Sequence, residues 1–274
     1  MKGLLLAFQF LTIVPIRVRG SVTEKDMARS AFWFPLVGLF QGVLAALGTL
    51  LFAAIFPPEV TSLLVIVVLV LANGGFHLDG LADTFDALAA KSSGNAATDR
   101  EKRLSVMKDS STGAIGVVAI VLAVLLKFIL VMQFVVNLPP LAACAFLLLL
   151  PLISKLAINI MMYHGKSARE DGLGRIFIDN TGIGTVIVSL LVTIALCLAA
   201  GLSGLIELCG FEIFTFFAVL LAALYLFTLA ATRVFAKRFG GLTGDTFGAV
   251  SELSEILYLI MAIGWLRICG GEGG

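Results

Sequence analysis

The first long apolar stretch of the chain reads AFWFPLVGLFQGVLAALGTLLFAAIF and covers residues 31–56. It exceeds the roughly 20 residues that a helix needs to cross the hydrocarbon core of a bilayer, and it holds no Asp, Glu, Lys or Arg. This stretch therefore predicts a transmembrane helix. Working outward from it, six further apolar runs predict more spans, at 60–76, 114–136, 139–163, 181–206, 212–235 and 250–268.

These runs do not alternate polar and apolar residues as barrel strands do. The predicted fold class is therefore all-α, a polytopic helical membrane bundle with about seven transmembrane helices (6–8). Of the 274 residues, 59% are hydrophobic and 14% are charged, against roughly 25% charged in an average soluble domain. This composition excludes a soluble enzyme, a disordered protein and a basic nucleic-acid binder, and it makes the lipid bilayer the first partner. We expect one membrane-embedded domain over residues 1–274.

The polar segments between the runs differ in charge and length. We expect residues 1–30 to form a cytoplasmic or interfacial N-terminal segment, in which 3–15 is an interfacial or re-entrant helix. Every second loop is long and basic, at 77–113, 164–180 and 233–249, whereas the short turns at 57–59, 137–138 and 207–211 lack Lys and Arg. The positive-inside rule then places the N-terminus and the basic loops in the cytoplasm and, with seven spans, the C-terminus outside.

The four cysteines are widely spaced and lie in or beside apolar runs, without a CxxC pair. This pattern predicts small apolar packing residues rather than a disulfide framework or a zinc site. They are Cys144, Cys197, Cys209 and Cys269.

The richest polar cluster reads GGFHLDGLADTFD at 74–86, within the 77–113 segment that we expect to be the cytoplasmic catalytic loop region. Asp79, Asp83 and Asp86 are spaced i, i+4, i+7, which places them within about 60° of one another on a helix. Like charges on one stripe repel unless a cation lies between them, and carboxylates with phosphate oxygens suit Mg²⁺. We expect all three to be metal ligands, with Asp83 and His77 also catalytic. The alternative is a solvated helix face at the membrane edge.

A second cluster, RLSVMKDSSTGAIG at 103–116, combines cations, hydroxyls and a glycine just before an apolar run. A helix N-terminus beside basic side chains is a ready anion site. We expect Arg103 and Ser110 to bind substrate phosphate and Lys108 to act in catalysis. The alternative is a basic membrane anchor with a helix cap.

A third cluster, GGLTGDTFG at 240–248, holds Asp245 and precedes Glu252 and Glu255. Two acids in the last apolar run either pair with lysines in the bundle, at 127 and 155, or face the polar site. We favour the site, and expect Asp245 and Glu252 to be metal ligands.

A fourth cluster, REDGLGR at 169–175, is short and charged. Arg175 is expected to contact the nucleotide part of a substrate, although the segment reads equally well as a plain loop. All four clusters fall on the same predicted cytoplasmic face.

The residues GFHLDGLADTFD at 75–86 resemble the signature of the cobalamin synthase family, the adenosylcobinamide-GDP ribazoletransferases. The likeness continues in order along most of the chain, in FLTIVP at 10–15, WFPLVG at 33–38, VMKDSSTGAIG at 106–116 and GLTGDTFGA at 241–249. It implies a Mg²⁺-dependent, multi-pass transferase of a prokaryotic cytoplasmic (inner) membrane with a cytoplasmic active face. Such an enzyme joins α-ribazole, or its 5′-phosphate, to adenosylcobinamide-GDP and releases GMP. This is the final assembly step of the vitamin B12 coenzyme.

One position departs from the family pattern, and two other functions are the alternatives to this resemblance. The family often has Arg after its MKDS motif, where this chain has Ser111, so Arg103 or Lys108 would have to supply that phosphate contact. A CDP-alcohol phosphotransferase would need Arg where Asp83 stands and a GxxxDxxxD segment that does not follow. An ion or proton transporter would place acids near the middle of several spans. Whether the chain forms a homo-oligomer stays open.

Overall fold

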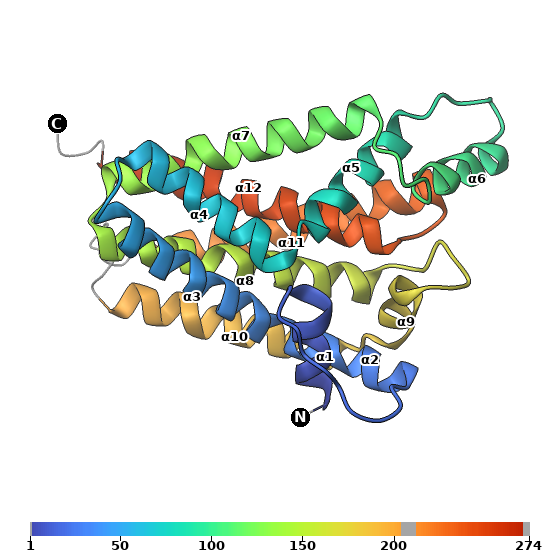
Figure 1. Cartoon of the computed structure of the whole chain (residues 1–274), viewed down its shortest axis with the longest axis horizontal. Helices are drawn as coiled ribbons and strands as arrows, with labels where there is room; N and C mark the ends of the chain where they lie inside the picture. Colours follow the sequence, from blue (N-terminus) through green and yellow to red (C-terminus); the bar gives the residue numbers. More distant parts are fainter. Residues whose placement is uncertain (1, 204–211, 271–274) are drawn as a thin grey trace.

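A computed structural model describes residues 2–203 and 212–270 of the chain (Figure 1). Over these residues the fold is an all-helical bundle, and its one backbone bridge between loops joins Ser167 to Leu242. The helices are α1 (Lys2–Leu11), α2 (Glu24–Ser30), the 3-10 turn η1 (Ala31–Trp33), α3 (Phe34–Ala53), α4 (Pro58–Asn73), α5 (Phe76–Ala89), α6 (Ala96–Val106), α7 (Ala114–Asn137), α8 (Pro140–His164), α9 (Leu173–Asn180), α10 (Ile183–Leu202), α11 (Glu212–Phe239) and α12 (Gly244–Gly270).

Six helical stretches in the described residues are long and apolar enough to cross a membrane, which confirms the predicted class. They are Glu24–Ala53, which runs through α2, η1 and α3, together with α7, α8, α10, α11 and, as Gly244–Ile268, α12. A seventh crossing is counted if α4 and α5, which meet at an angle of 86°, form one broken span. The apolar helix α1 has ten residues and is about 15 Å long, half the thickness of a hydrocarbon core.

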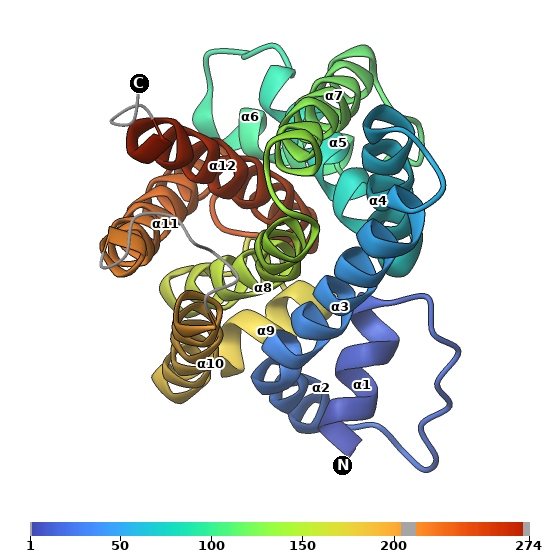
Figure 2. The same cartoon turned by 90° about the vertical axis from the view of Figure 1, so that its left-hand side faces the viewer.

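Helix α8 lies at the centre of the bundle, with α3, α10, α11 and α12 around it (Figure 2). Glycines let α3 approach α8 closely, because a Cβ added at Gly42 would lie 2.0 Å from the carbonyl oxygen of Leu148. On another side, the Tyr258 hydroxyl of α12 donates a hydrogen bond to the Phe146 carbonyl of α8 at 2.9 Å. Small residues at helix contacts are what membrane bundles use where no hydrophobic force drives association.

The polar connections gather at one end of the bundle. Helices α6 and α9 and the turn from α11 into α12 lie at this end, and α12 runs from there to the opposite end (Figure 1). The short turns after α3 and α7 lie at the opposite end (Figure 1). The turn expected at 207–211 lies outside the described residues. Of the cysteines, Cys144 and Cys197 are buried and free, as expected of packing residues, and the side chains of Cys209 and Cys269 lie outside the description.

Buried charges join α7 to α12 within the spans. Lys127 Nζ lies 2.6 Å from Glu252 Oε2 and 2.5 Å from Glu255 Oε2, and all three side chains are at least nine-tenths buried. Lys155 of α8 is also buried, and its Nζ donates to Ser154 Oγ at 3.3 Å. Charges at membrane depth are retained when they pair, so this cluster ties the two helices together.

We predict that Lys127→Met strongly destabilises the bundle, because it removes the direct ion-pair partner of two buried carboxylates. The expected loss is about 3–5 kcal/mol in the free energy of unfolding, the usual cost of breaking a buried ion pair. Thermal unfolding in detergent measures it, with Lys237→Met on the exposed end of α11 as the control. Equal melting temperatures for the two variants would contradict the prediction.

Candidate functional site

The first group of functional side chains stands on α5, which begins at a sharp turn. Gly74 and Gly75 both adopt left-handed backbone conformations, with φ of 66° and 74°, which residues with a Cβ rarely adopt. Asn73 Oδ1 accepts a hydrogen bond from the Gly75 amide at 2.9 Å and fixes the turn. The turn directs α5 away from α4, so the run predicted as one span over 60–76 ends at Asn73.

A close crossing of α5 and α12 brings a further carboxylate to this group. A Cβ added at Gly80 would lie 2.7 Å from the Asp245 carbonyl oxygen, and one at Gly248 would lie 2.9 Å from the His77 carbonyl oxygen. The two backbones touch there because neither glycine carries a side chain. As a result Asp245, in the first turn of α12, lies beside the acidic face of α5.

The electrostatics of Asp83 show how closely the acids gather. Its carboxylate experiences the negative charges of Asp79, Asp245 and Asp86, and the positive charge of Arg169 partly offsets them. Arg169 Nη2 lies 3.5 Å from Asp245 Oδ2, and neither atom has a hydrogen-bond partner although both are buried. The two groups form an ion pair that is longer than a direct hydrogen bond. The concentrated negative charge therefore favours a bound cation.

Arg169 is held in place by backbone pairing between two loops. The Ala168 amide donates to the Leu242 carbonyl at 2.9 Å, and the Leu242 amide donates to the Lys166 carbonyl at 2.7 Å. Gly241 permits this approach, since a Cβ there would lie 2.5 Å from the Ala168 nitrogen. The loop before α9 is thereby fixed against the turn that leads into Asp245.

Asp86 has a different set of partners from the rest of the acidic stripe. Its two carboxylate oxygens accept hydrogen bonds from the Gly113 amide at 2.7 Å and the Gly116 amide at 2.8 Å. These amides belong to the N-terminus of α7, where a carboxylate satisfies free donors and interacts favourably with the helix dipole. Asp86 therefore anchors the start of α7 to α5, and this contact limits the metal-ligand role predicted for it.

His77 stands near the start of α5, at the α5–α12 contact. Its side chain is buried, and Nδ1 lies 3.2 Å from the Ser251 hydroxyl of α12. The other ring nitrogen, Nε2, has no hydrogen-bond partner. The structure thus places His77 where it is packed against α12.

The structure corrects our preference for Glu252 as a metal ligand. Glu252 pairs with Lys127 inside the bundle, as does Glu255, which is the alternative that the sequence left open. Seven residues of helix separate Glu252 from Asp245, about 10 Å along the axis. Lys155 does not join this pairing by a direct salt bridge to a described residue, and its Nζ contacts Ser154 instead.

The predicted phosphate-binding residues are not brought to one point. Arg103 is buried, and its Nη1 donates to the Arg238 carbonyl near the end of α11 at 3.3 Å. Lys108 and Ser110 are exposed in the loop before α7. This loop lies near the site, because the Thr243 hydroxyl contacts Met107 Sδ at 3.7 Å. Arg175, on α9, is 3.5 Å from Glu24 Oε1.

A buried carboxylate orders the chain on the approach to α6, outside the spans. Asp99 accepts hydrogen bonds from the Ser92 hydroxyl and from the Ser93 amide and hydroxyl. These bonds lower the pKa of Asp99 to about 2. In the same way, bonds from the Ser111 hydroxyl and amide lower the pKa of Asp109. Both groups are ionised at neutral pH. Asp99 shapes the connection that leads into α6, and Asp109 shapes the loop that leads to α7.

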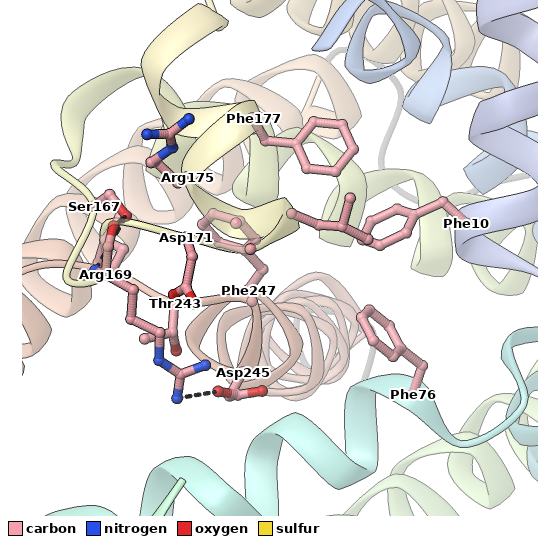
Figure 3. Close-up of a pocket in the computed structure, with 15 residues that line it drawn as sticks. Phe10, Phe76, Ser167, Arg169, Asp171, Arg175, Phe177, Thr243, Asp245 and Phe247 are labelled. Carbon is pink, nitrogen blue, oxygen red and sulfur yellow. Dashed lines mark hydrogen bonds and ion pairs between the residues drawn. The ribbon is translucent and has the colours of Figure 1, made fainter. Parts of the chain in front are cut away.

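A cavity of about 230 Å³ opens beside the acidic group. Arg169 and Asp245 line one part of it, and four phenylalanines from α1, α5, α9 and α12 line another (Figure 3). Arg175 also borders it, whereas Arg103 does not. The four rings belong to Phe10, Phe76, Phe177 and Phe247.

Two features of this site were missed in the sequence. The sequence favours Arg175 within the 169–175 segment, whereas in the structure Arg169 makes the contact with Asp245. The sequence analysis also predicts no functional role for the cavity phenylalanines, because phenylalanine in an apolar chain is usually a core or lipid-facing residue. A usable signal existed for three of them, since Phe76, Phe177 and Phe247 stand within or beside a polar motif rather than in the middle of a span.

The acids fit a Mg²⁺ site in which water and substrate phosphates supply the remaining ligands. No three His, Cys, Asp or Glu side chains within residues 2–203 and 212–270 come close enough to enclose a metal ion. Mg²⁺ is commonly held by one or two carboxylates together with water and substrate phosphates. Asp83 and Asp245, whose charges act on one another, fit that kind of site, and Oδ2 of Asp245 also faces Arg169 at 3.5 Å. A cage of all five predicted ligands is not present among the described residues.

Together, the helical bundle and the acidic group beside a half-aromatic cavity define a polytopic membrane protein with a polar site at one end of its spans. A family model described as Cobalamin-5-phosphate synthase matches residues 3–263. A protein of Geotalea daltonii named adenosylcobinamide-GDP ribazoletransferase is 40% identical over 262 residues, covering 94% of this chain and 96% of its own. Proteins with the same name from Thermodesulfovibrio yellowstonii and Caldanaerobacter subterraneus are 35% and 33% identical, each covering at least 93% of both chains.

The chain therefore belongs to the Cobalamin-5-phosphate synthase family, as its motifs suggested. No solved structure matches it.

We predict that Gly80→Ala separates α5 from α12, because the added Cβ would meet the backbone of Asp245, which cannot rotate away. Such overpacking typically costs about 1–3 kcal/mol, and thermal unfolding in detergent measures it. Gly264→Ala, also in a helix, is the control, since nothing lies within 4 Å of its Cβ position. A Gly80→Ala protein as stable as the Gly264→Ala protein would argue against the tight crossing.

Proposed function

We propose that this protein is an adenosylcobinamide-GDP ribazoletransferase, which transfers the cobinamide phosphate of adenosylcobinamide-GDP to α-ribazole or its 5′-phosphate and releases GMP. The product is adenosylcobalamin or its 5′-phosphate, in the final assembly step of the coenzyme. Membership of the family and the names of the relatives support this assignment. Neither a CDP-alcohol phosphotransferase nor a transporter is favoured by these comparisons.

The observation that carries the proposal is the gathering of carboxylates from two distant segments beside an arginine. Asp83 lies within the electrostatic influence of Asp79 and Asp245, and Arg169 contacts Asp245 from a third segment. A diphosphate ester needs both signs of charge around it. The arginine binds its oxygens, and the acids hold a cation that neutralises its charge or accept a proton.

The reaction itself requires little covalent help from the protein. A ribose hydroxyl oxygen of the incoming nucleoside forms a bond to the phosphorus that carries cobinamide. The bond from that phosphorus to the GMP oxygen breaks, and GMP leaves with the electron pair. The hydroxyl proton passes to one of the other carboxylates gathered around Asp83. Arg169 and the exposed Lys108 would offset the charge of the departing phosphate.

We further propose that the reaction depends on Mg²⁺ held by Asp83 and Asp245, with Asp79 close by. The bound ion would polarise the diphosphate oxygens as a Lewis acid. His77 would act through its packing, because its contact with Ser251 fixes α5 against α12. Asp86 would position the loop that carries Lys108 and Ser110 by anchoring the start of α7.

The same reasoning proposes an orientation in the membrane. The basic segments that contain α6 and α9 and the turn before α12 lie at the end of the bundle that carries the site (Figure 1). By the positive-inside rule this end would face the cytoplasm of a prokaryotic cytoplasmic membrane. Both phosphorylated substrates would then reach the site from the cytoplasm.

We predict that Asp83→Asn lowers the rate of GMP release by about 100-fold or more, the loss typical of removing a group that stabilises transition-state charge. The assay supplies adenosylcobinamide-GDP and α-ribazole phosphate, with Mg²⁺ or with a chelator. Glu59→Gln, which changes an exposed acid at the start of α4, serves as the control and should keep full activity. Near-normal turnover of Asp83→Asn at saturating Mg²⁺ would refute the role given to Asp83.

A further inference from the structure

The cavity beside the acidic group has two chemically different parts. Its aromatic wall is preorganised, since the ring of Phe10 lies 5.0 Å from that of Phe177 and 5.4 Å from that of Phe76, measured between centroids. Phe34 packs behind this wall, 5.5 Å from Phe177. The polar part is formed by Arg169 and Asp245 together with Ser167, Asp171, Arg175 and Thr243 (Figure 3).

The rings come from separate segments, and the fold gathers them at one point. Phe177 and Phe247 are buried, whereas 38% of the Phe76 surface is exposed. Phe76 is the first residue of α5, so the glycine turn that sets the direction of the acidic helix also sets the position of this ring. The aromatic wall and the carboxylates are therefore parts of one arrangement.

We propose that this aromatic wall is the subsite for the benzimidazole base of the incoming ribazole, an inference that rests on the proposed function. Benzimidazole is a flat aromatic bicycle, and such bases gain affinity by contact with aromatic side chains. Its ribose would then lie toward Asp245 and Arg169, where the attacking hydroxyl is needed. The cavity thus orders the nucleoside from its base to its reacting oxygen.

The other groups that the two substrates present match this wall less well. A corrin ring system is much larger than a cavity of about 230 Å³. Guanine carries several hydrogen-bonding groups on its edge, which match the polar part around Asp171 better than the phenylalanine wall. A lipid chain would need no charged pair at one end of its site. The base of ribazole is the substrate part that needs an apolar aromatic wall joined to a charged end.

Phe76→Leu tests the subsite, because it removes the ring but keeps an apolar side chain at a partly exposed position. GMP release is measured while α-ribazole is varied at saturating adenosylcobinamide-GDP, and then with the two substrates exchanged. We expect the KM for α-ribazole to rise about tenfold, in line with the loss of one base–aromatic contact. The KM for adenosylcobinamide-GDP should not rise. Phe76→Tyr, which retains an aromatic face, should restore most of the affinity for α-ribazole.

Phe56→Leu is the matched control, since this phenylalanine is similarly exposed, at 41%, and lies in the turn after α3. An unchanged KM for α-ribazole in Phe76→Leu, or an equal rise for both substrates, would overturn the subsite. A wild-type protein that releases no GMP from the two substrates would instead refute the proposed function. Free benzimidazole gives a second readout, and we expect it to compete with α-ribazole less effectively in Phe76→Leu than in the wild type.

Discussion

The close crossing of α5 and α12 is the contact on which the site depends. Gly80 and Gly248 lie against the backbone of the opposite helix, at distances that leave no space for a Cβ. Between helices in lipid, such close packing replaces the hydrophobic force that drives association in water. It places Asp245 beside the acidic face of α5, and the loop pairing at Leu242 adds Arg169. Without the crossing, these groups would be isolated charges at the ends of separate spans.

The chain deals with the cost of charge in a membrane in two ways. Within the spans, Lys127 pairs with Glu252 and Glu255, and the buried Lys155 nearby offsets the second negative charge, so these charges contribute to the packing of α7 on α12. At one end of the bundle, the acids around Asp83 outnumber Arg169, which pairs with Asp245. An unbalanced group of this kind is expensive unless it has a ligand. We therefore assign the balanced cluster to structure and the unbalanced one to chemistry.

The apolar runs predicted the helical bundle, because span length depends only on the thickness of the bilayer. They did not predict the bend after Asn73, where two left-handed glycines end a run that continues in the sequence. The stripe of Asp79, Asp83 and Asp86 was also visible, since helical spacing is a local property. The separate role of Asp86 was not visible in the sequence, because its carboxylate contacts the amides of Gly113 and Gly116 only in the folded chain.

The same limit explains the errors over Glu252 and the loop before α9. Helical spacing put Glu252 on the same stripe as Asp245, but the position of Lys127 decides its partner. Likewise, the sequence offers two arginines in one loop, and the pairing with Leu242 determines that Arg169 reaches Asp245. Contacts between segments far apart in the chain were thus the part that composition and periodicity could not supply.

The central claim is that Asp83 binds the metal ion on which the transfer depends, and a change of metal preference tests it most directly. Thiolates favour softer metals than carboxylates do, so an Asp83→Cys protein should lose GMP release with Mg²⁺ and regain part of it with Cd²⁺. The wild-type protein should show the opposite preference. Full activity of Asp83→Cys with Mg²⁺, or a loss that no metal relieves in a protein that unfolds at the wild-type temperature, would contradict the account.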